Sequence, residues 1–374
     1  MTARIPSSQL TENVMEDPKS ASVIDGDGHV FEDIPAIWEY FPTNWRNRLA
    51  PIMKELFPPL DHLHHSLTSI PEGSFQDPGS QGWVNALDAL NFAAAVLYPT
   101  QGLAIGRTTD ADLAVTTCAA YNDWLTHAYL ALDPRLKGVA LLPLQDPQAA
   151  AAELDRTVSG LGFVGGLLPT TGLKSHLGDS LYWPVYEKAS RLGCSLSVHG
   201  GGHSGMGFDH FNVFAGTHAL GHPVAIAAAL AGMTFNGVFQ KFPEARFAFL
   251  EGGVGWFAMA MERFDESFEA FPPINPRGKL LDMPPGQTVS DHIRQRMNTG
   301  HLVIGVEGEE PLLGWAVREY GNTGFMYTSD YPHEVTVRSC RRALDDIRHH
   351  PQLSNADKTA LLGGNASLFY GINS

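Results

Sequence analysis

Short apolar segments alternate with longer segments of helical periodicity along most of this chain, and that alternation restricts its fold more than any other feature. Segments with the β-branched or small apolar composition of buried strands are residues 22–27, 92–99, 138–146, 163–169, 194–200, 246–253, 302–308 and 325–333. Between them, stretches such as 111–132, 147–162 and 223–243 place apolar residues three and four positions apart, as one helix face does. Eight strand–helix units in 374 residues predict an α/β fold, a parallel (β/α)8 barrel.

Two segments interrupt the alternation. Residues 42–86 follow the first strand and are rich in Pro, Gly, His and Ser, and residues 271–300 precede the seventh strand. We interpret both as insertions into one domain, residues 21–374. Residues 1–20 are polar, with no apolar run of a signal peptide, and are predicted to be a flexible arm.

The charge and cysteine content exclude some classes of partner. The net charge of −15 is spread along the chain without a Lys/Arg cluster, which argues against nucleic acid and anionic membranes as partners. No apolar run is expected to reach transmembrane length. The cysteines Cys118, Cys194 and Cys340 lie far apart, so we expect no disulfide framework and a cytoplasmic location.

Residues that bind metals fall where the predicted strands end. Asp27 and His29 end the first strand, His199 the fifth, Glu251 the sixth and Asp330 the eighth. Each alone would more often be a hydrogen-bonded residue or a helix cap, but the carboxyl ends of barrel strands meet at one rim. Mixed imidazole and carboxylate ligands suit Zn, Mn or Fe better than calcium. The sequence therefore predicts a metal site at that rim.

Four histidines follow the fifth strand: His203, His210, His218 and His222. His203 and His218 are the preferred candidates for acid–base groups near the site. His218 and His222 are four residues apart, and the nearby Pro223 places them at the start of a helix.

Three further groups receive weaker assignments. The histidines within residues 62–65 are expected to be solvated. Glu32 and His333 are candidates for supporting the ligands or the loop. Arg107, near the end of the second strand, is a candidate cation for a substrate carboxylate. An arginine at this position is equally often a surface residue that binds no ligand.

Several motifs resemble a known family. The opening "IDGDGHVFE", the segment "FNGVFQKFPEARFAFLEGGVGWFAMAMERFD", "YTSDYPHE" and the ending "LLGGNASLFYG" resemble the amidohydrolase-related (amidohydrolase-2) branch of the amidohydrolase superfamily, and the whole is similar to its metal-dependent nonoxidative decarboxylases. The resemblance implies a distorted TIM barrel with metal ligands Asp27, His29, His199 and Asp330. It fails at Glu251, where decarboxylases often carry a catalytic histidine.

Three functions remain open. The first is a lyase or hydrolase with one Zn or Mn ion, most often a decarboxylase of a small carboxylated substrate, in which Asp330, Glu251 or a loop histidine moves protons. The second is an oxygenase with an Fe or Mn/Fe pair, in which Glu251 and His218 bind the second ion. The third is a noncatalytic barrel subunit stabilised by metal. The resemblance also implies homo- or hetero-oligomers with related barrels.

Overall fold

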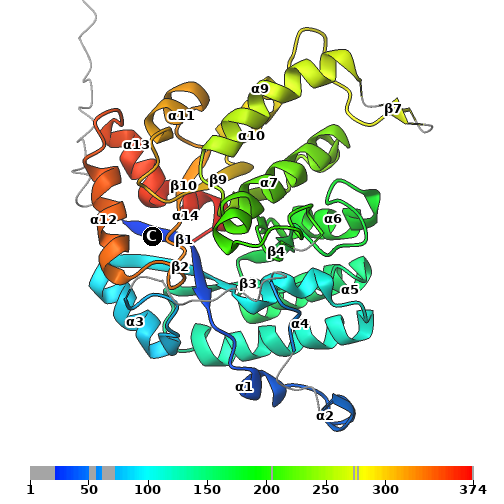
Figure 1. Cartoon of the computed structure of the whole chain (residues 1–374), viewed down its shortest axis with the longest axis vertical. Coiled ribbons are helices and arrows are strands. Elements are labelled where there is room, and N and C mark those ends of the chain that lie inside the picture. Colours follow the sequence, from blue (N-terminus) through cyan, green and yellow to red (C-terminus); the bar gives the residue numbers. More distant parts are fainter. Residues whose placement is uncertain are drawn as a thin grey trace, which may run out of the picture.

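The centre of the molecule is a barrel of eight parallel strands arranged in sequence order (Figure 1). The computed structural model describes residues 22–49, 56–60, 72–203, 205–272, 274–275 and 278–372. The barrel strands are β1 (Val23–Val30), β2 (Phe92–Pro99), β3 (Leu136–Ala140), β4 (Gly165–Pro169), β5 (Ser195–His199), β6 (Arg246–Leu250), β9 (Leu302–Val306) and β10 (Phe325–Tyr327). The predicted barrel is confirmed.

Backbone hydrogen bonds join the last strand to the first. The amide of Asp330 donates to the carbonyl of Asp27 over 2.9 Å, and the amide of His29 donates to the carbonyl of Tyr331 over 2.7 Å. These bonds lie just beyond β10, at the residues that end β1. The barrel therefore closes at the point where the predicted ligands are found.

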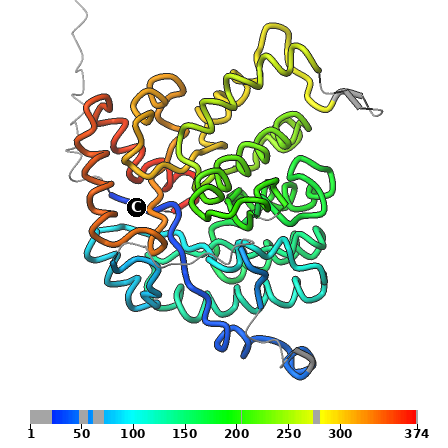
Figure 2. The backbone as a smooth tube through the Cα atoms, viewed as in Figure 1, coloured from blue at the N-terminus to red at the C-terminus, as the bar shows by residue number. Residues whose placement is uncertain are grey.

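Helices surround the barrel on its outer side (Figures 1 and 2). They are α1 (Ile34–Trp38), α2 (Thr43–Leu49), α3 (Gly79–Leu90), η3 (Gln101–Arg107), α4 (Ala111–Leu125), η4 (Thr126–Leu130), α5 (Pro147–Arg156), η5 (Thr157–Leu161), η6 (Ser180–Tyr182), α6 (Trp183–Leu192), α7 (Phe214–Phe235), α8 (Val238–Lys241), α9 (Gly255–Ala270), α10 (Val289–Asn298), α11 (Leu313–Tyr320), α12 (Val337–Arg348), α13 (Asn355–Thr359), η7 (Ala360–Gly364) and α14 (Asn365–Tyr370). Side chains at several N-caps fix where helices begin, as Asp146 does by accepting hydrogen bonds from the first amides of α5.

Several predicted strands are longer than the observed ones, and two of them exceed the observed strand most. The segment 138–146 leaves the barrel after Ala140, because a turn brings Asp146 to the cap of α5. The segment 325–333 leaves it after Tyr327, and Asp330 then adopts a left-handed φ of 55°. After Ala140 the apolar composition continues to Leu144, so composition alone did not show where β3 ends. After Tyr327 the polar residues Thr328 and Ser329 mark the end of β10, and the prediction extended past them.

The helix α7 differs from its prediction. It begins at Phe214 and continues through Pro223, so His218 and His222 lie within it and not at its start. Its 22 residues are long and apolar enough to cross a membrane by length and composition, so the expectation that no segment reaches that length is wrong. Residues such as Ile226 and Leu230 are buried against the protein core, so α7 serves as a barrel helix here.

The two predicted insertions contain regular elements where they are described. Residues 42–86 include α2 and the first two turns of α3, and residues 271–300 include α10 and a hairpin of β7 (Ile274–Asn275) and β8 (Gly278–Lys279). Residues 1–20, the predicted arm, lie outside the described residues. The three cysteines are unpaired, as the absence of a disulfide framework predicts, and all three are buried.

A buried hydroxyl network lies inside the barrel beneath the candidate site. The Tyr98 hydroxyl donates to Ser197 Oγ over 2.6 Å and lies 2.8 Å from the Tyr370 hydroxyl, which donates to the carbonyl of Gly26 over 2.8 Å. The C-terminal helix α14 thus reaches the first barrel strand, and α14 and β1 lie against each other.

Candidate active site

Four of the predicted ligands converge at the carboxyl ends of the strands. His29 Nε2 lies 3.6 Å from Asp27 Oδ1 and 3.4 Å from Asp330 Oδ1. His199 Nε2 lies 3.3 Å from Asp27 Oδ2. Ligand atoms about 2.1 Å from a metal are separated by roughly 3.0 to 3.4 Å in octahedral or tetrahedral geometry. The observed spacings are close to those values.

Hydrogen bonds determine which nitrogen of each histidine faces this point. His29 Nδ1 lies 2.9 Å from the carbonyl of Pro99, and His199 Nδ1 lies 2.6 Å from the carbonyl of Gly200. A carbonyl only accepts, so each Nδ1 carries a proton and Nε2 is the nitrogen left to bind a metal ion. Backbone acceptors behind metal-binding histidines hold the ring and its tautomer in this way.

The polar atoms that converge here lack hydrogen-bond partners in the described part of the chain, as expected of metal ligands. Both carboxylate oxygens of Asp27, Nε2 of His29, Nε2 of His199 and Oδ1 of Asp330 are buried, and none has a hydrogen-bond partner in the described part of the chain. Buried polar atoms without partners are rare because each costs free energy. A divalent cation would satisfy all of them at once.

The electrostatics of these residues are consistent with that conclusion. Burial lowers the pKa of His29 well below its usual range, so its lone pair is available. Burial raises the pKa of Asp27 and of Asp330, because their charges are costly without a cation. Burial by itself lowers the pKa of His199, but the carboxylates of Asp27 and Glu251 outweigh it and raise that pKa to about 9.

Glu251 lies beside these ligands and contacts three histidines. Its Oε2 is 2.7 Å from His222 Nδ1 and 3.5 Å from His199 Nδ1, and its Oε1 is 3.8 Å from His333 Nδ1. Glu251 has a left-handed φ of 64°, a conformation that costs most residues about 1 kcal/mol or more. The strained residue thus directs a buried carboxylate into the site.

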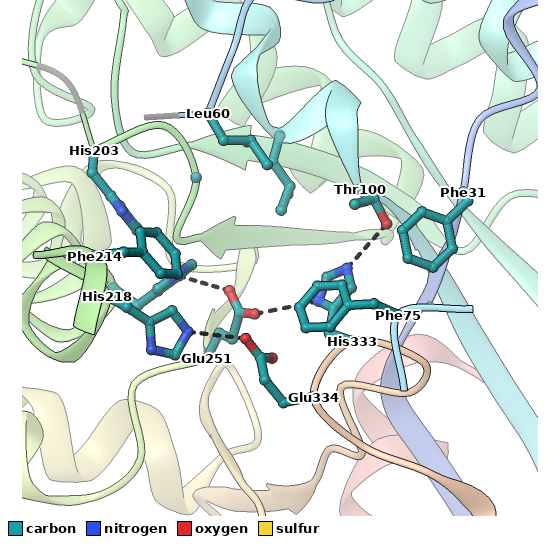
Figure 3. Close-up of a pocket in the computed structure, with 13 residues that line it drawn as sticks. Phe31, Leu60, Phe75, Thr100, His203, Phe214, His218, Glu251, His333 and Glu334 are labelled. Atoms are coloured by element: carbon teal, nitrogen blue, oxygen red, sulfur yellow. Dashed lines mark hydrogen bonds and ion pairs between the residues drawn. The ribbon is translucent and has the colours of Figure 1, made fainter. Parts of the chain in front are cut away.

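A pocket opens beside this cluster (Figure 3). Its apolar wall consists of Phe31, Leu60, Phe75, Leu103 and Phe214, and its polar wall of Thr100, His203, His218, His222, Glu251, His333 and Glu334. Neither lysine nor arginine occurs among its described lining residues. The described part of the pocket wall therefore offers aromatic surface, imidazoles and carboxylates, but no lysine or arginine.

The loop histidines have different positions. His203 and His218 line the pocket, as preferred, and so does His222, whereas His210 is exposed and does not. His222 was the weaker candidate in the sequence, yet it is the one that pairs with Glu251. Gly200 makes this possible, because a Cβ there would overlap the His222 imidazole.

The remaining candidates lie at the margin or outside the described residues. Arg107 donates a hydrogen bond to the carbonyl of Pro59 and does not line the pocket, so its role as a substrate cation stays a prediction. Glu32 is buried and accepts hydrogen bonds from the amides of Gln101 and Gly102, so it supports the backbone after β2. The histidines of residues 62–65 lie outside the described residues.

Comparison of the chain with models of known protein families identifies its family. A family model described as amidohydrolase matches residues 64–268, more than half of the chain. The chain belongs to this amidohydrolase family. The chain is 26% identical over 259 residues to the 2-amino-3-carboxymuconate-6-semialdehyde decarboxylase of Dictyostelium discoideum. The match covers 67% of this chain and 66% of that protein. The chain is also 25% identical over 281 residues to a gamma-resorcylate decarboxylase of a Polaromonas species, covering 72% and 81%.

Two solved structures with the same fold are those of decarboxylases. A 5-carboxyvanillate decarboxylase from Novosphingobium aromaticivorans, with bound manganese, superposes with a TM-score of 0.70 at 19% identity, covering 94% of the amidohydrolase and 98% of that chain. A manganese-containing dihydroxybenzoic acid decarboxylase from Polaromonas gives a TM-score of 0.65 at 20% identity, covering 95% and 98%. At these identities the likeness establishes the fold of this amidohydrolase.

Proposed function

We propose that this amidohydrolase is a metal-dependent, nonoxidative carboxy-lyase that acts on a small aromatic acid. The observation that carries the proposal is the set of unpartnered donor atoms on Asp27, His29, His199 and Asp330, which lies next to an aromatic pocket. The relatives named above are decarboxylases, which supports the same reaction class. Manganese in the related structures favours manganese over zinc as the native ion.

The pocket wall favours a substrate with a single carboxylate. Phe31, Phe75 and Phe214 offer apolar surface for a ring. A bound divalent ion would hold the carboxylate and an adjacent oxygen and withdraw electron density from the ring. A second carboxylate would face Glu251 or Glu334 with no lysine or arginine among the described lining residues, so we expect dicarboxylates to bind poorly.

His218 and Glu334 are placed to handle the proton that decarboxylation consumes. When the bond between ring and carboxylate breaks, its electron pair stays on the ring carbon, which must then take a proton. His218 Nε2 lies 3.4 Å from Glu334 Oε1, and both line the pocket and remain partly exposed to solvent (Figure 3). We assign His218 as the proton donor and Glu334 as the group that orients it.

The test is turnover of manganese-loaded protein on a panel of hydroxybenzoates, with CO2 and the decarboxylated phenol measured together. Wild type should release one CO2 for each phenol formed, and His29→Ala should neither retain manganese nor turn over. Replacing His218 with glutamine should lower kcat by about 100-fold or more with a smaller effect on KM. Consumption of substrate without CO2, as in hydrolysis, or full activity in His29→Ala would refute the proposal. Metal-loaded protein inactive on all aromatic acids would favour a noncatalytic subunit.

We further propose that the protein works in the cytoplasm as an oligomer. Three buried, unpaired cysteines support a reducing compartment. Light scattering during size-exclusion chromatography measures the assembly, and a mass of 40.6 kDa would identify a monomer and contradict this proposal.

A further inference from the structure

Asp25 is a buried carboxylate two residues before the ligand Asp27, and the proposed function gives it no role. Its side chain is fully buried inside the barrel. Both of its oxygens already accept hydrogen bonds, whereas those of Asp27 accept none in the described part of the chain. Asp25 is therefore suited to hold other groups in place and not to bind an ion itself.

The carboxylate of Asp25 connects the first barrel strand with the loop that follows β10. Its Oδ1 accepts from the amide of Asp27 over 3.2 Å and from the amide of Ser329 over 2.9 Å. Its Oδ2 accepts from the Ser329 hydroxyl over 2.6 Å. One side chain thus joins the backbone of one predicted ligand, Asp27, to the residue directly before another, Asp330.

The same network holds the backbone on both sides of Asp330. The Ser329 hydroxyl oxygen accepts from the amide of Tyr331 over 3.0 Å, so Ser329 and Tyr331 are both tied to Asp25. Asp330 between them has a left-handed φ of 55°, a strained conformation that persists only where its surroundings hold it. The hydrogen bonds from Asp25 therefore help to maintain the conformation that directs Asp330 toward the ion.

The spacing of the Asp27 and Asp330 carboxylates is the quantity that this network fixes. Oδ1 of Asp27 lies 3.6 Å from His29 Nε2, and Oδ1 of Asp330 lies 3.4 Å from it. The two carboxylates come from opposite ends of the chain, so contacts between distant segments must set their spacing. Metal sites require ligand positions within about 0.5 Å, and replacing a residue behind the ligands typically weakens metal binding by about 10- to 100-fold.

We propose that Asp25 is a positioning residue of the metal centre, whose carboxylate, acting through Ser329, sets Asp330 at the distance from Asp27 that a divalent ion requires. The inference rests on the metal centre of the proposed function, but it does not depend on the reaction or the substrate. The alternative is that Asp25 only stabilises the fold. In that case its replacement would lower the free energy of unfolding and leave the metal affinity of the folded protein unchanged.

The experiment measures the Kd for Mn²⁺ by calorimetry on chelator-treated, substrate-free protein, together with the electron paramagnetic resonance spectrum of the bound ion. Asp25→Ala should raise the Kd at least about 10-fold and change the spectrum. Ser329→Ala keeps both amide bonds to Oδ1 and loses only the hydroxyl, so it should raise the Kd by a smaller factor, about 3-fold or more. Tyr370→Phe is the matched control, because it removes a buried hydroxyl that bonds the carbonyl of Gly26 in the same strand, and it should leave the Kd unchanged.

Two further variants separate positioning from mere stabilisation. In Asp25→Asn the side-chain oxygen can still accept from both amides and the NH2 group can donate to Ser329 Oγ, so the Kd should return to within about 3-fold of wild type. Because Asp25 acts through Ser329, the double variant of Asp25→Ala and Ser329→Ala should bind Mn²⁺ no more weakly than Asp25→Ala.

Other outcomes would overturn the proposal. A folded Asp25→Ala with the Kd and spectrum of wild type is incompatible with it, as is an Asp25→Asn that binds as weakly as Asp25→Ala or an equal loss in Tyr370→Phe. If Asp25→Ala does not fold, judged by circular dichroism, a wild-type Kd in Ser329→Ala refutes the proposal instead. The measurement requires no turnover. Protein whose Mn²⁺ affinity depends on Asp25 but which acts on no aromatic acid would therefore refute the proposed function and leave this inference standing.

Discussion

Gly28 lies between the ligand residues Asp27 and His29, and its missing side chain leaves room for the indole of Trp83. A Cβ at Gly28 would overlap Cη2 of Trp83 and lie 2.9 Å from its Cζ2. Trp83 is fully buried, and its Nε1 donates a 2.9 Å hydrogen bond to the carbonyl of His29. Replacing Gly28 with alanine should therefore displace Trp83 and, with it, the backbone that carries His29.

The magnitude follows from two costs. Overpacking a filled core costs about 1 to 3 kcal/mol. Loss of the hydrogen bond to the His29 carbonyl adds about 0.5 to 1.5 kcal/mol. We expect Gly28→Ala to lower the free energy of unfolding by about 1.5 to 4.5 kcal/mol, and to weaken metal binding because His29 moves.

Urea unfolding of the metal-free protein measures the effect without the contribution of the metal. Gly26→Ala is the matched control: its Cβ would lie 3.1 Å from both Sδ of Met326 and the carbonyl oxygen of Tyr327, which is a tight contact but not an overlap, so we expect a smaller loss. Trp83→Phe should give part of the space back, so the double variant should lose at least about 1 kcal/mol less than the sum of the single losses. Stability of Gly28→Ala within about 0.5 kcal/mol of wild type, or strict additivity with Trp83→Phe, would refute the argument.

Three further outcomes follow from other parts of the site. Burial raises the pKa of Glu32 to about 7 from an ordinary 4.5. Between these two pH values the folded protein keeps a proton that the unfolded chain loses. The free energy of unfolding should therefore fall by up to about 3 kcal/mol as pH rises from 4.5 to 7. Urea titrations at several pH values should show that Glu32→Gln lacks this part of the slope; parallel curves for the two proteins would contradict it. Tyr370→Phe removes the hydroxyl that bonds Gly26 and should cost about 1 to 3 kcal/mol in unfolding free energy with the metal count unchanged; a lower count would mean that the network also holds the ligands. Removing metal from wild type should lower the melting temperature, because free Mn²⁺ at 100 times its Kd stabilises the folded protein by about 2.7 kcal/mol. The melting temperature of His29→Ala should not change when Mn²⁺ is added.

The sequence by itself determined the barrel and most of the strand-end residues. All eight strands were found because buried parallel strands are short apolar runs, and this signal is local. Asp27, His29, His199, Glu251 and Asp330 were proposed as site residues for the same reason, since each lies within a few residues of the end of such a run and the carboxyl ends of barrel strands share one rim.

Tertiary structure alone decided which further residues join them. His222 was distinguished from its neighbours only because α7 continues through Pro223 and Gly200 leaves space for its ring. Arg107 was a candidate carboxylate partner by its position in the sequence, and only the fold showed that it donates to the carbonyl of Pro59 and is not among the described lining residues of the pocket. The position of a side chain on a loop or helix depends on packing between segments distant in sequence, and no local pattern encodes those contacts.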